Sequence, residues 1–115
     1  MNRIHAPADL TELPNWVLWK YEERFGKRTK VPYSRRGTAA SSTNPADWAT
    51  FEDVTAFYDT HRKSYAGVGV VFDGAGMCGV DLDNCLNADQ SVKDWAQPII
   101  GRFAHTYMEV SPSGT

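Results

Sequence analysis

The sequence predicts an α+β fold with a mainly antiparallel sheet and two flanking helices. Short runs rich in β-branched and aromatic residues follow one another across tight turns. Two further segments begin with a capping box and carry apolar residues at helical spacing. Hairpins interrupted by single helices are typical of antiparallel α+β domains, and 115 residues suffice for one domain.

The first predicted unit is a β-hairpin. Residues 16–21 combine tryptophan, valine, leucine and tyrosine, which are enriched in strands. Residues 24–27 contain a glycine and predict the turn, and residues 29–33 predict the returning strand. Pro32 has no N–H to donate, so this strand is expected at a sheet edge. Residues 34–47 are rich in serine, threonine, alanine and asparagine, and are expected to form a loop.

A helix and a second hairpin are expected next. Thr50 and Asp53 form a capping box, and apolar residues recur at helical spacing through about residue 62. Residues 67–72 and 77–83 then predict two strands joined by a glycine-rich turn.

The last part of the chain predicts a second helix and a strand. Ser91 and Asp94 form another capping box, so the helix is expected to open there. Pro98 lacks an N–H donor and is expected to bend it. Residues 107–110 predict the final strand.

Overall composition excludes several classes of protein. Hydrophobic residues make up 42% and charged residues 23%, so a disordered tail, a collagen-like repeat and a coiled coil are excluded. No apolar run is long enough for a membrane span. The two cysteines are too few for a disulfide framework, so a reducing, cytoplasmic location is expected.

Basic residues are concentrated early in the chain, although the net charge is −2. Such a positive patch could bind a polyanion with one face, whereas the alternative is a solvated, charged hairpin. Charge alone favours the solvated hairpin. The patch consists of Lys20, Arg24, Lys27, Arg28, Lys30, Arg35 and Arg36.

Asp81 and Asp83 are the sharpest local signal. Side chains two residues apart on a strand share a face, so the two carboxylates are expected to project together while Val80 and Leu82 anchor the strand in the core. Adjacent carboxylates repel each other, and Mg²⁺ or Mn²⁺ is the natural compensation. The alternative is a solvated strand end at which Asn84 opens a turn.

Ser111, Ser113 and Gly114 form a second candidate site. Small hydroxyl residues around a glycine can turn backbone N–H groups toward a phosphate, and the alternative is an ordinary turn. The chain ends within this segment, directly after a predicted core strand. We therefore expect residues 1–115 to be part of a domain that is incomplete at its C-terminus.

Five ordered motifs together resemble the N-terminal part of primase-polymerases of the archaeo-eukaryotic primase superfamily, in the branch encoded by phages and other mobile elements. The resemblance extends from about Trp16 to the end of the chain. The motifs are Lys30-Val31-Pro32-Tyr33, the run from Ala40 to Phe51 that contains Ser42-Thr43-Asn44-Pro45, Gly67-Val68-Gly69-Val70-Val71-Phe72, Gly79-Val80-Asp81-Leu82-Asp83-Asn84-Cys85, and Glu109-Val110-Ser111-Pro112-Ser113-Gly114-Thr115.

The resemblance implies nucleotidyl transfer on a DNA template, and the chain would be the first half of the catalytic core. The family's acidic signature falls on Asp81 and Asp83, which would be catalytic and would hold Mg²⁺ or Mn²⁺ in a two-metal mechanism. The family's histidine motif lies beyond Thr115, so the chain alone is expected to be inactive. Nucleotide-binding roles are implied for Ser111, Ser113, Gly114 and Lys30, and nucleic-acid contacts for Lys27, Arg28, Arg35 and Arg36.

The implied partners are template DNA and nucleoside triphosphates, with no membrane and in many family members a helicase in the same polypeptide. The rival hypothesis is a non-catalytic DNA-binding or replication-scaffold module that uses the basic hairpin 20–36. A phosphoesterase built on Asp81 and Asp83 is disfavoured, because neither a histidine nor a further acid lies nearby in the sequence.

Overall fold

The computed structural model describes residues 4–72 and 77–111. These residues divide into two units, the first extending to Cys78 and the second beginning at Gly79. Each unit is described by itself below.

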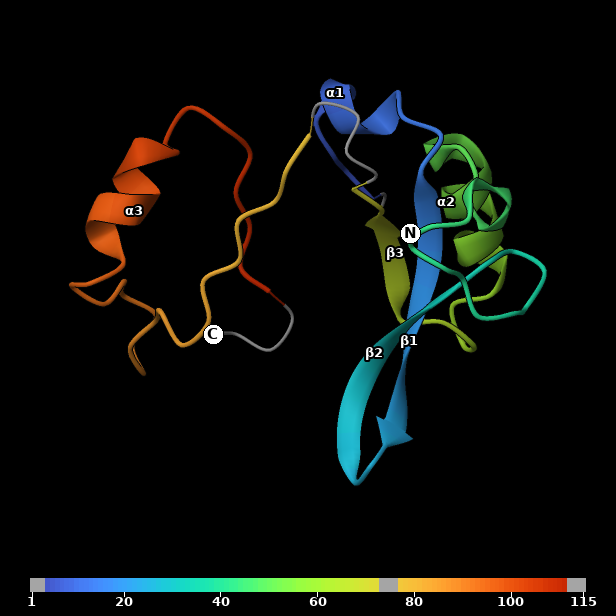
Figure 1. Ribbon diagram of the computed structural model, residues 1–115, viewed down its shortest axis with the longest axis horizontal. Coiled ribbons are helices and arrows are strands. Elements are labelled where there is room, and N and C mark those ends of the chain that lie inside the picture. Colours follow the sequence, from blue (N-terminus) through green and yellow to red (C-terminus); the bar gives the residue numbers. More distant parts are fainter. Residues whose placement is uncertain (1–3, 73–76, 112–115) are drawn as a thin grey trace. The chain divides into compact units, whose positions relative to one another are not determined.

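A three-stranded antiparallel sheet forms the centre of the first unit (Figure 1). Its strands are β1 (Trp16–Arg24), β2 (Lys27–Tyr33) and β3 (Gly67–Val70), in the order β2-β1-β3. The predicted hairpin is confirmed as β1 and β2. Pro32 lies on the edge strand β2, as its missing N–H predicts.

The hairpin turn has only two residues. Arg24 pairs with Lys27, and the intervening Phe25 and Gly26 have φ angles of 54° and 75°. Two consecutive positive φ angles define the type I′ turn, whose twist matches that of the flanking strands. Gly26 suits this conformation, whereas a phenylalanine at such a φ is unusual.

Helix α2 (Phe51–Thr60) covers one face of β1 and β3 (Figure 1). The predicted cap is confirmed, because the Thr50 hydroxyl accepts a hydrogen bond of 3.1 Å from the Asp53 amide. Val54 of α2, Trp16 and Leu18 form the buried core, in which Leu18 is fully inaccessible to solvent.

Two short elements complete the first unit. Helix α1 (Ala8–Thr11) precedes the sheet, and the indole Nε1 of Trp16 donates a 2.9 Å hydrogen bond to the carbonyl of Leu10. The 3-10 helix η1 (Pro45–Asp47) lies in the predicted loop and is capped by Asn44. The α+β class with an antiparallel sheet is confirmed.

The second unit contains one helix, α3 (Gln97–Arg102), among its described residues. The predictions of strands at 77–83 and 107–110 are wrong, because their described residues form no strand. A strand needs a neighbouring strand to bond its backbone N–H and C=O groups. β3 has such a neighbour, because it pairs with β1. Val80, predicted to be a core residue, is 57% exposed.

The predicted start of the second helix is also wrong. Ser91 instead bonds to Asp89 through both its amide and its hydroxyl, and these bonds lower the pKa of the Asp89 carboxyl. The helix begins six residues later, and Pro98 lies in its first turn rather than at a bend. Proline suits the first turn because its missing N–H has no helical partner there.

The cysteines and the lengths of the helices complete the description. Cys78 is exposed, Cys85 is buried, and no disulfide joins them. None of the helices in residues 4–72 and 77–111 is long and apolar enough to cross a membrane.

We predict that Leu18→Ala lowers the free energy of unfolding by about 2–5 kcal/mol, because it opens a cavity beneath α2. Val80→Ala is the matched control and should change it by less than about 0.5 kcal/mol, since Val80 is largely exposed. Urea unfolding followed by circular dichroism measures both. Equal losses for the two variants would contradict the placement of the core.

Candidate nucleic-acid interface

The face of the sheet opposite α2 carries aromatic and basic side chains. Because successive side chains of a strand alternate, Trp19 and Tyr21 lie on the opposite side of β1 from the core residue Leu18. Lys30 lies directly across from Tyr21, and Arg28 lies two pairs further toward the turn, across from Glu23. We call Trp19, Tyr21, Arg28 and Lys30 together the Trp19 face.

Each ring of the Trp19 face is paired with a cation. The guanidinium carbon of Arg28 lies 3.9 Å from the centroid of the Tyr21 ring, and Lys30 Nζ lies 4.9 Å from that of Trp19. The two rings meet edge to face with centroids 5.2 Å apart. Cation–π contacts of this kind are worth about 0.5–1 kcal/mol at exposed sites. They hold two flexible basic side chains against the sheet.

Glycines of β3 make room for the Trp19 ring. Gly67 pairs with Trp19, and a Cβ atom at Gly67 would lie only 2.7 Å from the indole Nε1. The same Nε1 donates a 3.1 Å hydrogen bond to the carbonyl of Val68. The indole is therefore fixed against the backbone of β3, with its position set by the absence of a side chain at Gly67.

A second aromatic and basic group lies on the α2 side of the sheet. Lys20 Nζ lies 4.4 Å from the ring centroid of Tyr33 and 5.8 Å from that of Tyr65. The Tyr33 hydroxyl donates a hydrogen bond to the Glu22 carboxylate. This bond lowers the pKa of Glu22 and raises the pKa of Tyr33. The arrangement locks β1 to β2 across the hairpin.

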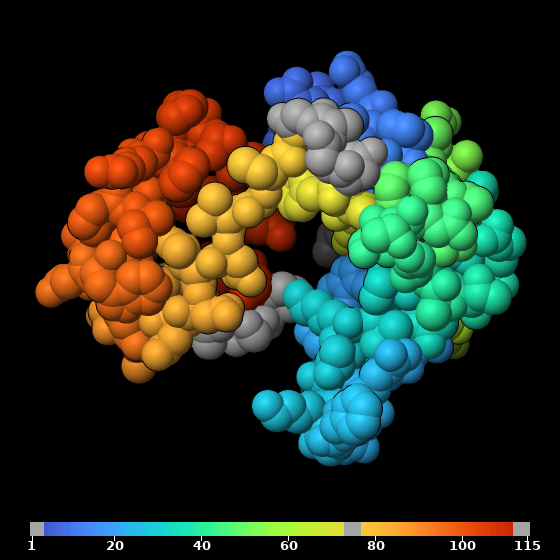
Figure 2. Space-filling model, in the orientation of Figure 1, coloured from blue at the N-terminus to red at the C-terminus, as the bar shows by residue number. Residues whose placement is uncertain are grey.

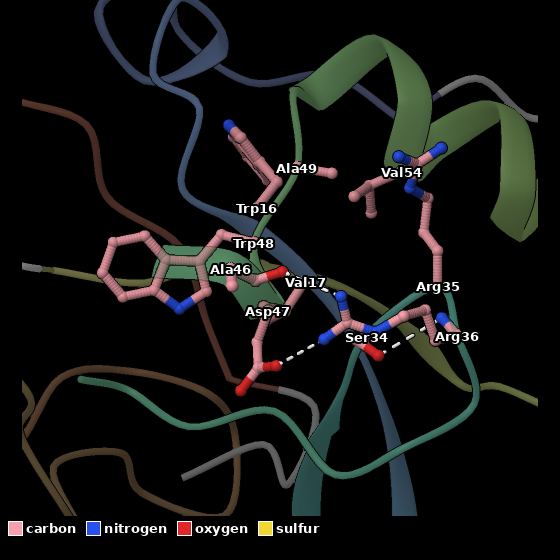
Figure 3. Close-up of a pocket in the computed structure, with 10 residues that line it drawn as sticks. All are labelled: Trp16, Val17, Ser34, Arg35, Arg36, Ala46, Asp47, Trp48, Ala49 and Val54. Atoms are coloured by element: carbon pink, nitrogen blue, oxygen red, sulfur yellow. Dashed lines mark hydrogen bonds and ion pairs between the residues drawn. The ribbon is translucent and has the colours of Figure 1, made fainter. Parts of the chain in front are cut away.

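A pocket of about 160 Å³ lies where the loop after β2 returns to the sheet (Figure 3). Arg36 Nη2 donates to Asp47 at 2.8 Å, and Arg36 Nη1 donates to the Ala46 carbonyl at 3.3 Å. Arg35 lies 3.9 Å from the carboxylate of Asp53. The pocket is lined by Trp16, Val17, Ser34, Arg35, Arg36, Ala46, Asp47, Trp48, Ala49 and Val54.

These ion pairs bear on the predicted nucleic-acid contacts of Arg35 and Arg36. Both guanidinium groups already have a carboxylate partner, so their charge is partly compensated within the first unit. Lys27, Arg28 and Lys30 on β2 have no carboxylate partner among the ion pairs of the described residues. β2 therefore carries three basic side chains that form none of these ion pairs.

Asp81 and Asp83 lie in the second unit, in a segment without regular structure, and both are exposed. The prediction that a strand presents them on one face is wrong, because residues 81–83 belong to no strand. Residues 4–72 and 77–111 contain no group of three histidine, cysteine or acidic side chains able to hold a metal ion. Ser111 is half-buried, while Ser113 and Gly114 lie outside the described residues.

The aromatic part of the Trp19 face was not predicted from the sequence. Trp19 and Tyr21 are both only partly buried, and neither was among the candidate site residues. The alternation along β1 could have predicted it, because Trp16 and Leu18 share one face while Trp19 and Tyr21 share the other. Only one of these faces can lie beneath a single helix.

The chain is similar to a replication enzyme encoded by a phage. The relative is the DNA primase-polymerase of Nitratiruptor phage NrS-1. The chain is 33% identical to it over 114 residues, which cover 96% of the chain. The chain spans only 15% of that protein. No protein-family model matches the chain. The similarity confirms the resemblance to primase-polymerases that the five motifs predict.

We predict that the Glu22–Tyr33 hydrogen bond makes the free energy of unfolding depend on pH in both the acidic and the alkaline range. The contribution of Glu22, whose folded pKa is lowered, is complete above its ordinary pKa of 4.5 and is lost as pH falls through the folded value. That of Tyr33, whose folded pKa is raised, is complete below 10.0 and is lost as pH rises through the folded value.

Tyr33→Phe should therefore reduce the loss of stability at both extremes, and urea midpoints measured from pH 3 to pH 11 would show it. Tyr21→Phe is the control, because it removes a tyrosine hydroxyl from β1 on the other face of the same sheet. An unchanged alkaline limb in Tyr33→Phe would contradict the role of this hydrogen bond.

Proposed function

We propose that the chain is part of a primase-polymerase that joins nucleotides from nucleoside triphosphates on a DNA template. The observation that carries the proposal is the 33% identity to a phage primase-polymerase over 96% of the chain. The five ordered motifs and the basic β2 strand support it. A role in DNA replication follows from the same similarity.

Asp81 and Asp83 are our candidates for the catalytic metal ligands. Carboxylate oxygens are the donors that Mg²⁺ and Mn²⁺ prefer, so the chemistry of this pair fits the ions. Two carboxylates leave most of an octahedral shell to other groups, and residues 77–111 offer no third clustered ligand. When bound, such ions would supply charge neutralisation at the reacting phosphates.

The remaining roles concern phosphate groups. We assign Ser111, Ser113 and Gly114 to the triphosphate side of the site, on the resemblance that links them to the family motif. Lys30 and Arg28 are exposed cations on one strand and suit contacts with phosphates of DNA or nucleotide. We expect the complete protein to act in the cytoplasm, where its template would lie. A helicase in the same polypeptide stays a prediction.

The rival function is a non-catalytic DNA-binding module that uses the hairpin and leaves the carboxylates idle. The basic and aromatic Trp19 face is the observation in its favour. The two functions differ in one respect, because only the primase-polymerase needs Asp81 and Asp83.

We predict that the complete protein extends a primer on a DNA template, and that Asp81→Asn or Asp83→Asn lowers the rate about a hundredfold or more. A primer-extension assay with Mg²⁺ or Mn²⁺ and all nucleotides measures it. The 115-residue chain should give no extension, since its described residues gather no complete metal site. Retention of DNA binding without any extension by the complete protein would favour the rival function.

We predict weak binding of Mn²⁺ to the isolated chain at the acidic pair. Paramagnetic broadening in an NMR spectrum should centre on residues 81–83 and should disappear in the double variant Asp81→Asn, Asp83→Asn. The control is Asp9→Asn with Glu12→Gln, which removes two exposed acids at α1 and should leave the broadening unchanged. Uniform broadening at all acidic residues would refute the site.

A further inference from the structure

We infer that the Trp19 face, together with Phe25 at the hairpin tip, binds an unpaired nucleic-acid strand by stacking on its bases. The inference deepens the proposed function and rests on it, because it names the form of the template and the element that receives it. It assigns to β1 and β2 the capture of single-stranded template.

The first argument is the exposure of the cation over the Tyr21 ring. Arg28 is exposed, so the side of its planar guanidinium that faces away from Tyr21 lies toward solvent. A guanidinium plane stacks on a nucleobase as well as on a tyrosine. Arg28 can therefore lie between Tyr21 and a base, because its contact with the Tyr21 ring is already formed.

The second argument is the position of Phe25. It lies in the turn that joins β1 to β2, its side chain is fully exposed, and its φ angle is 54°. A two-residue hairpin turn favours asparagine or glycine at this position, so hairpin formation does not account for a phenylalanine there. Figure 2 shows the tip of this hairpin projecting beyond the remainder of the first unit. An exposed ring at a projecting tip can stack on a base.

The third argument is charge. Residues 16–33 contain five basic and two acidic residues, whereas the chain after residue 36 is predominantly acidic. Lys27 and Lys30 stand on the same strand as Arg28 and can contact phosphates on either side of a stacked base. Aromatic rings interleaved with cations suit single strands, since the bases of a duplex are stacked on one another and are not available to the protein.

The test is equilibrium binding of fluorescein-labelled oligonucleotides to the 115-residue chain, followed by anisotropy. The chain should bind a 20-nucleotide single strand about tenfold more tightly than a duplex of the same sequence at equal salt. Tyr21→Leu combined with Phe25→Leu should weaken single-strand binding about tenfold and remove the preference, whereas Tyr21→Phe should retain it.

A matched pair of arginine variants guards against loss of folding. Arg28→Ala should weaken single-strand binding severalfold. Arg62→Ala should leave it unchanged, although Arg62 also lies over a tyrosine ring, 4.7 Å from the centroid of Tyr58 on α2. Thermal unfolding of every variant shows whether the fold is retained.

Equal affinity for single strand and duplex, or equal effects of Arg28→Ala and Arg62→Ala, would overturn the inference. Its failure is distinguishable from failure of the proposed function. Primer extension by the complete protein with unaltered binding in the Tyr21 and Phe25 variant would refute only the inference. Single-strand binding that depends on the Trp19 face, in a complete protein that does not extend primers, would refute only the primase-polymerase.

Discussion

The strict alternation of side chains along β1 is the constraint on which the first unit depends. β1 is hydrogen-bonded to a neighbour along each edge, so its backbone cannot rotate or slip without breaking both ladders. Trp16 and Leu18 consequently lie beneath α2 and form the core with Val54. Trp19 and Tyr21 are committed by the same constraint to the opposite face.

The central position of β1 also determines how the long loop after β2 is held. The amide and carbonyl of Trp16 bond to the carbonyl and amide of Ala49 at 2.8 and 2.9 Å, which returns the loop to the start of the strand. The ion pair between Arg36 and Asp47 then closes the loop upon itself and forms one wall of the pocket (Figure 3). The position of β1 thus determines where the core, the pocket and the Trp19 face lie.

Charge separates two kinds of chemistry along the chain. Basic side chains are carried by β2, where cation–π contacts hold Arg28 and Lys30 against aromatic rings. The acids suited to metal ions lie in the second unit, where no regular element of the described residues positions them.

The sequence by itself determined the features that depend on neighbours along the chain. The hairpin of β1 and β2, the edge position of Pro32, the Thr50 cap and the resemblance to primase-polymerases all follow from local residue types and their order. Their physical causes, turn chemistry, a missing N–H and a capping hydroxyl, act within a few residues.

Only the tertiary structure decided the features that need a distant partner. The sequence predicts strands at 67–72, 77–83 and 107–110 alike, but among the described residues only the first contains a strand, because β3 pairs with β1. The burial of Leu18 and the exposure of Val80 differ for the same reason, although both are aliphatic residues in short apolar runs. A strand is stabilised by hydrogen bonds to another strand, and residue type alone does not specify where that partner lies.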